Sequence, residues 1–134
     1  MSLENSSMIS EFLDKKNVFA VIGVSRDPEK YGNKVYTDLK NAGYIVYPIN
    51  PNANKIFGNK CYAELKDLPK KPDVVSIVVP PKITEKIVME CKKLNIHKVW
   101  MQPGSQSNKS IEYCKKNKIN LLHDVCIIIE RSKK

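Results

Sequence analysis

The sequence predicts an α/β domain with a doubly wound, parallel five-stranded sheet and helices on both of its faces. Three observations support this fold class. Five short runs of apolar residues recur along the chain, segments with apolar residues at helical spacing separate most of them, and the connections are short. Strands that alternate with helices in this way are typical of parallel sheets, and right-handed crossovers place the helices on both faces. We expect the strand order 3-2-1-4-5.

The strands are predicted from runs of largely β-branched residues that stop at glycine, proline or asparagine. The first run, residues 18–24, contains only apolar residues and one glycine, so we expect this strand to be buried on both faces. The remaining runs are mainly apolar. In chain order, the five strands are predicted at residues 18–24, 44–49, 73–79, 97–101 and 119–122.

The helices are predicted from apolar residues three or four positions apart. Val35, Leu39 and Ala42 mark a helix that begins near Asn33 and stops at Gly43. For the helix at residues 84–94, the predicted inward face consists of Ile83, Ile87, Cys91 and Leu94. Further helices are predicted within residues 1–17 and at residues 63–68, 107–117 and from 125 onward.

Length and composition limit the class of protein. The 134 residues amount to a single domain, here an N-terminal helix within residues 1–17 and a core of residues 18–129. No apolar run approaches the roughly 18 residues of a membrane span, and the N-terminus lacks the pattern of an export signal. We therefore expect a cytoplasmic protein with no membrane partner and four free thiols. The sequence is compatible with a monomer and with a homodimer.

The net charge of +9 does not by itself predict a nucleic-acid partner. The positive residues are 21 lysines and only two arginines, Arg26 and Arg131. The lysines are scattered and are not interleaved with aromatic residues, as they would be on a nucleic-acid surface. An anionic small molecule needs only a few of these charges, so we expect such a ligand and no nucleic acid.

Four predicted strands are followed by glycine, proline or small polar residues, which make up residues 23–25, 50–51, 79–81 and 102–104. In a doubly wound sheet, ligands bind beyond the carboxyl ends of the strands at the point where the strand order reverses. In the expected order this point lies between the first and fourth strands. The four loops should therefore converge on one crevice.

The loop after the first strand predicts an anion site. Gly23 allows a backbone to approach a ligand closely, and Ser25 adds a hydroxyl group. The helix that follows offers free N–H groups and the positive end of its dipole, with Lys30 and Lys34 beside it. The dinucleotide spacing G-x-G-x-x-G is absent, and a lone glycine also serves a simple tight turn.

The residues at the end of the second strand distinguish between NAD and other nucleotide ligands. An NAD site needs a carboxylate there to bind the ribose, but this strand ends in Asn50 and Pro51, with Lys55 close by. A cation suits an additional phosphate on the ribose, which NADP and coenzyme A both carry. The second glycine of the dinucleotide spacing G-x-G-x-x-G is missing, which argues against NADP.

Five segments of the chain carry a resemblance to a known family. In chain order they are VIGVSRDPEKYGNKV, GYIVYPINPNANKIFGNKCYAEL, DVVSIVVPP, KVWMQPGSQSN and LLHDVCIII. They resemble the small stand-alone CoA-binding domain proteins, which are similar to the N-terminal CoA-binding domain of the succinyl-CoA synthetase α subunit. The resemblance implies a Rossmann-like domain that binds coenzyme A or an acyl-CoA across the strand ends.

The resemblance also implies which residues contact coenzyme A. These are Gly23, Ser25 and Arg26 at phosphate or ribose, Asn50, Pro51 and Lys55 near the adenosine 3′-phosphate, Val79 and Pro80 at adenine or the start of the pantetheine arm, and Gln102, Pro103 and Gly104 on the far side.

No catalytic constellation is expected. The larger synthetases phosphorylate a histidine in a second domain, which this chain lacks. His123 lies close enough in sequence to Cys126 to activate its thiol, but no oxyanion-hole motif accompanies the pair. Paired Cys/His spacing for zinc is absent as well. We expect a CoA-binding protein that is not an enzyme. The alternatives are an NADP-dependent enzyme and a thiol-redox or protein-interaction module with a vestigial nucleotide site.

Overall fold

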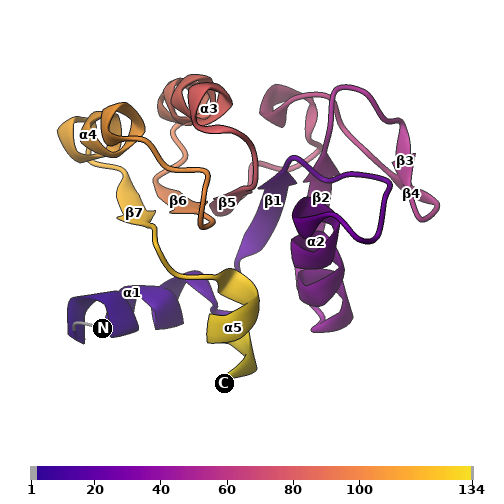
Figure 1. Cartoon of the computed structure of the whole chain (residues 1–134), viewed down its shortest axis with the longest axis horizontal. Coiled ribbons are helices and arrows are strands. Elements are labelled where there is room, and N and C mark those ends of the chain that lie inside the picture. The colour runs from indigo at the N-terminus through magenta and orange to yellow at the C-terminus, as the bar shows by residue number, and fades with distance from the viewer. Residues whose placement is uncertain (1–2, 134) are drawn as a thin grey trace.

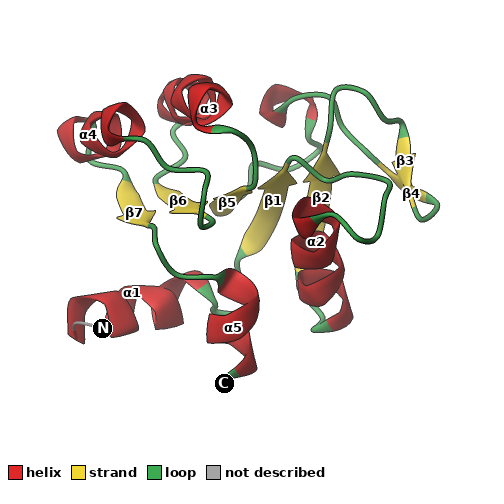
Figure 2. Cartoon of the chain, in the orientation of Figure 1, coloured by secondary structure: helices red, strands yellow, loops and turns green. Residues whose placement is uncertain are grey.

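The structure, a computed structural model, describes residues 3–133 and confirms the fold class predicted from the sequence (Figures 1 and 2). Five parallel strands form the sheet: β1 (Val18–Ile22), β2 (Ile45–Ile49), β5 (Val74–Ile77), β6 (Lys98–Met101) and β7 (Asn120–Leu122). The helices are α1 (Leu3–Phe12), α2 (Tyr31–Asn41), α3 (Pro81–Lys93), α4 (Asn108–Lys116) and α5 (Ile127–Ser132). No helix within residues 3–133 is long and apolar enough to cross a membrane.

The strand order within the sheet differs from our expectation. It is β2-β1-β5-β6-β7, so β5 lies between β1 and β6 rather than at the edge beyond β2. The predicted order 3-2-1-4-5 is therefore wrong in the place of its third strand. Pro48 gives the physical reason, because this residue of β2 pairs with Val21 and has no N–H to donate to a further strand. Proline at this position confines β2 to the sheet edge.

Two apolar layers enclose the sheet, one on each face (Figure 1). Phe19 and Val21 of β1 pack in the layer that contains buried residues of α1, α2 and α5. Ala20 and Ile22, which alternate with them, pack in the layer formed with α3 and α4. Because all five residues of β1 are buried, the prediction of a strand covered on both faces is confirmed.

Helix α3 begins earlier than expected, with Pro81 in its first turn, where a missing N–H costs nothing. The face that turns inward also differs from the predicted one. The buried residues of α3 are Thr84, Val88 and Cys91, whereas Ile83 is 45% exposed. The predicted inward position of Ile83 is therefore wrong, and the neighbouring face of the helix is free to line a cavity.

The segment between β2 and β5 holds less helix than expected. It contains a hairpin of β3 (Lys55–Ile56) and β4 (Asn59–Lys60), and the helix predicted at residues 63–68 is a single 3₁₀ turn, Leu65–Asp67. Tyr62 continues the hairpin along the outer edge of β2, where its N–H donates to the Pro48 carbonyl at 3.0 Å. The segment therefore runs beside the carboxyl end of β2.

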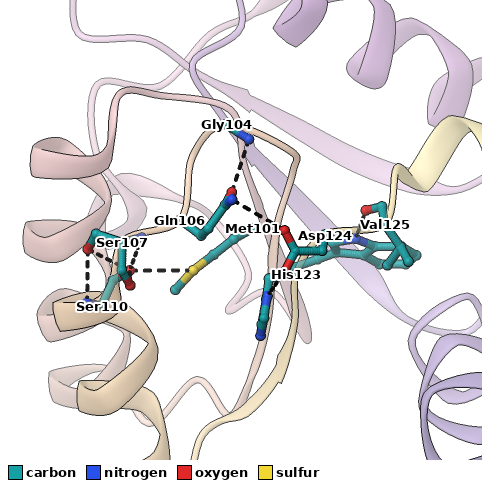
Figure 3. Close-up of polar contacts among 9 residues, drawn as sticks. Met101, Gly104, Gln106, Ser107, Ser110, His123, Asp124 and Val125 are labelled. Carbon is teal, nitrogen blue, oxygen red and sulfur yellow. Dashed lines mark hydrogen bonds and ion pairs between the residues drawn. The ribbon is translucent and has the colours of Figure 1, made fainter. Parts of the chain in front are cut away.

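The C-terminal segment is tied to the sheet by side chains. The indole N–H of Trp100 donates to the Val125 carbonyl at 2.8 Å, and Arg131 forms a two-pronged ion pair with Asp38 of α2. Figure 3 shows a second tie, in which Gln106 stands between the backbone of Gly104 and the carboxylate of Asp124. These contacts hold the loops after β6 and β7 together.

Candidate functional site

A cavity of about 420 Å³ opens at the carboxyl ends of β1, β2 and β5, beside α3. The order reverses here, because the chain passes from β1 to β2 on one side and reaches β5 on the other. Ligands of doubly wound sheets bind at such a point, and the volume lies within the usual range for small-molecule sites. Its wall is largely apolar and includes Ile22, Ile49, Leu65, Val79, Ile83 and Ile87.

Two glycines, Gly23 in the cavity lining and Gly32 in α2, set how the β1 loop packs beside the cavity. Gly23 has a φ of +95°, and a Cβ atom there would lie 2.2 Å from the carbonyl oxygen of Val78. Gly32, in the first turn of α2, faces Gly23 from the other side, and its Cβ atom would lie 2.0 Å from the Gly23 carbonyl oxygen. Neither position has room for a side chain. The first turn of α2 therefore packs directly on the β1 loop.

Asparagine side chains fix the shape of the same loop. Asn50 donates from Nδ2 to the Val24 carbonyl at 2.9 Å and accepts the N–H of Asn52 at 2.8 Å. Asn33, from α2, donates to the Ser25 carbonyl at 2.7 Å. The hydroxyl of Ser25 accepts the Asp27 N–H and keeps its own proton to donate. Ser25 can therefore offer a hydrogen bond to an anion in the cavity.

Three charged residues line the cavity: Glu64, Lys86 and Glu90. Burial raises the pKa of the Glu90 carboxyl, and the nearby Glu64 carboxylate raises it further. A backbone hydrogen bond at Leu65 acts in the opposite direction. Lys86 is exposed and is the single positive residue along this wall in the described part of the chain. The cavity thus combines an apolar wall with one cation and two carboxyl groups.

Residues 17–132 match the family described as CoA binding domain. The chain belongs to this family. The CoA-binding domain family predicted from the sequence is therefore confirmed, and its match covers nearly all of the chain.

Individual relatives of this CoA-binding domain include both large ligases and small proteins. The chain is 42% identical over 79 residues to acetate–CoA ligase [ADP-forming] II of Archaeoglobus fulgidus; the match covers 58% of the chain but only 12% of the ligase. A conserved hypothetical protein from Pyrococcus furiosus has a TM-score of 0.81 at 37% identity, covering 85% of this chain and 98% of its own. A hypothetical protein from Pyrococcus horikoshii has a TM-score of 0.90 at 29% identity, and the match covers 99% of this chain and 92% of that protein.

The structure brings one group of the predicted contact residues of the CoA-binding domain together. Gly23, Ser25, Asn50, Pro51 and Val79 all line the cavity. They come from the ends of three adjacent strands, which is the arrangement that the sequence predicted from the punctuation after each strand.

The second group of predicted contacts lies outside the lining of this cavity. It consists of Arg26, Lys30, Lys34, Lys55, Pro80, Gln102, Pro103 and Gly104. Lys34 instead lines a separate groove of about 410 Å³ on the outer face of α2, together with Asp38 and Phe57. Lys55 lies in the hairpin, exposed and directly opposite Lys60.

Gln102 is completely buried, and its amide group bonds to other parts of the protein. Its Oε1 accepts the N–H of Ile127 at 2.9 Å and the hydroxyl of Tyr31 at 3.2 Å, while Nε2 donates to Ser76 at 3.2 Å. Gln102 therefore joins β5, β6, α2 and α5. The structure gives this residue a role in holding the elements around the site.

Our sequence analysis missed Gly32, Lys86 and Glu90. Glycine in the first turn of a helix costs about 1 kcal/mol relative to alanine, so Gly32 already indicated a close contact. Lys86 and Glu90 had no such signal, because a charged residue on a helix usually faces solvent. They lie beside the cavity because α3 is rotated so that the face carrying Ile83 lines it.

The thiols divide into two groups. Cys91, as predicted, and Cys114 are fully buried, and burial raises the pKa of the Cys114 thiol to about 12. Burial also raises the thiol pKa of Cys61. Cys126 is partly exposed, and its Sγ accepts the hydroxyl of Tyr31 at 2.8 Å. Within residues 3–133, no three His, Cys, Asp or Glu side chains are grouped to hold a metal ion.

Proposed function

We propose that the protein binds coenzyme A or an acyl-CoA in the cavity at the carboxyl ends of β1, β2 and β5, and that it acts as a binding module rather than an enzyme. One observation carries the proposal: in a chain of the CoA binding domain family, this cavity lies where the strand order reverses. Several relatives are acetate–CoA ligases, and a ligand of the CoA type is the one that these relatives and this chain would share.

The geometry of the rim supports binding of the phosphate groups. The first turn of α2 packs on the Gly23 backbone, and Gly23 and Ser25 line the cavity, so the positive end of the α2 dipole lies next to the loop that carries the Ser25 hydroxyl. The apolar wall beyond them suits a flat base or a hydrocarbon chain. An anionic group at one end and an apolar group at the other match a CoA-type ligand.

Thermal unfolding with a ligand panel tests the proposal. A ligand present at a hundred times its Kd stabilises the fold by about 2.7 kcal/mol, which corresponds to an upward Tm shift of several degrees. We expect such shifts with coenzyme A and acetyl-CoA and none with NAD. Equal shifts with NADP and coenzyme A would favour the NADP alternative or a general nucleotide site. No shift with any of them would refute the proposal.

A variant that fills the cavity adds a structural control. Ala63 is exposed but lines the cavity, so Ala63→Trp should block it while leaving the core intact. Lys115→Trp, on the exposed side of α4, introduces the same side chain elsewhere. We expect loss of CoA binding only in the first variant. Acetyl-CoA incubated with the native protein should be recovered intact, because no catalytic step is proposed.

A further inference from the structure

The position of Glu90 in the cavity suggests which part of the ligand reaches it. Ile83, Ile87 and Glu90 are three or four residues apart and line the cavity from one face of α3. At 1.5 Å per residue, Glu90 lies about 10 Å along the helix from Ile83. Since α3 begins at the carboxyl edge of the sheet, Ile83 lies near this edge and Glu90 lies two turns further in.

The charges at this inner end disfavour a phosphate group, because Glu64 and Glu90 place two carboxyl groups here against the single lining cation Lys86. Glu90 lies close enough to Glu64 for the two carboxyl groups to influence one another, and Leu65 and Ile87 add apolar surface beside them. A second anion here would be repelled, whereas an N–H donor would be accepted. The phosphates therefore belong at the Gly23 and Ser25 end, and the group at Glu90 must be apolar with an N–H donor at its edge.

We infer that Glu90 makes the cavity selective for a purine that carries a 6-amino group, as adenine does. The inference rests on the proposed binding of coenzyme A and names the part of that ligand that the inner end accepts. The carboxyl oxygen of Glu90 accepts a hydrogen bond from the amino group. Hypoxanthine has a carbonyl oxygen at the same position, which would repel the carboxyl oxygens of Glu90, and its neighbouring N1–H could reach Glu90 only if the base moved from the position that adenine takes.

Isothermal titration calorimetry with coenzyme A and its deaminated analogue, which contains hypoxanthine, tests the inference. A hydrogen bond to a charged group is usually worth about tenfold or more in affinity. We expect the native protein to prefer coenzyme A by at least that factor. In Glu90→Gln the preference should largely disappear, because an amide can both accept from an amino group and donate to a carbonyl oxygen.

Glu85→Gln is the matched control, since Glu85 lies on the same helix but outside the cavity lining and accepts a hydrogen bond from Ser107 at 2.7 Å. It should keep the preference of the native protein. Equal affinity of the native protein for both ligands overturns the inference even if Glu90→Gln fails to fold. A full preference retained in folded Glu90→Gln also overturns it, and binding would then depend on another contact. If neither ligand binds the native protein, the proposed function fails and the inference with it.

Discussion

Two opposite effects on stability are expected when Gly32 is replaced by alanine, a gain in helix propensity and a steric clash. In an unobstructed helix, alanine is more stable than glycine by about 1 kcal/mol. In this protein, a Cβ atom on Gly32 would lie 2.0 Å from the carbonyl oxygen and 2.9 Å from the carbonyl carbon of Gly23, whereas ordinary contacts begin at 3.4 Å. Both atoms belong to the backbone and cannot rotate away. The first turn of α2 must therefore move outward by roughly 1 Å or more, against a close-packed neighbour.

Overpacking of this kind costs about 1–3 kcal/mol, which exceeds or cancels the gain in helix propensity. We expect Gly32→Ala to be less stable than the native protein by up to about 2 kcal/mol in urea unfolding. Because the β1 loop moves with α2, CoA affinity should fall by tenfold or more in calorimetry.

Gly58→Ala provides the control for lost stability without a change at the cavity. Gly58 has a φ of +80° at the tip of the β3–β4 hairpin, and a Cβ atom there would have no neighbour within 4 Å. Alanine in that conformation costs about 1–2 kcal/mol through backbone strain alone. We expect CoA affinity to be unchanged in this variant. If Gly32→Ala is as stable as the native protein and binds coenzyme A equally well, the close contact between α2 and the β1 loop has no part in binding.

Two further predictions concern charged side chains. Lys55 lies in the exposed hairpin outside the cavity lining, so Lys55→Ala tests whether this side chain reaches the 3′-phosphate of a bound ligand. If it does, the affinity for coenzyme A falls by about tenfold and that for 3′-dephospho-CoA is spared, because a charge-assisted bond is lost; an equal loss for both ligands, or no loss, excludes Lys55 as that contact. Burial raises the folded-state pKa of Glu90 above its ordinary 4.5, so the folded state favours the protonated carboxyl. The contribution of Glu90 to the free energy of unfolding is therefore complete below pH 4.5 and is lost as the pH rises through the raised pKa. Glu90→Gln should therefore be more stable than the native protein at pH 7, with a difference that shrinks below pH 4.5; urea midpoints at both pH values check this, and a less stable variant at pH 7 contradicts it.

The sequence predicted the elements of the fold better than their order. Runs such as residues 18–24 and 73–79 are predicted as strands whatever the strand order in the sheet, because a continuous apolar run indicates burial on both faces. Which strands lie side by side depends on pairing between distant residues, and a right-handed crossover is compatible with either side of β1. Pro48 is a local signal for the edge position of β2, since proline disfavours a central strand.

The candidate site was predictable to the extent that it depends on strand ends. Gly23, Asn50 and Val79 meet because parallel strands in one sheet end at the same edge. Glu90 could not be predicted in the same way, because its position depends on the rotation of α3 about its own axis. In the structure, Thr84 and Val88 face inward, and the packing of α3 in the folded protein fixes this rotation.

The central position of β1 has a consequence for the order of events during synthesis. β1 is the first strand to emerge, yet one of its edges pairs with β5, and the Val18 N–H donates to the Asp73 carboxylate 55 residues later. At usual translation rates of about 5–20 residues per second, that edge waits about 3–11 s for its neighbour. Until then, an apolar strand with unpaired backbone groups is exposed next to the ribosome, so the nascent chain is most prone to wrong pairing during the interval in which residues 23–77 are added.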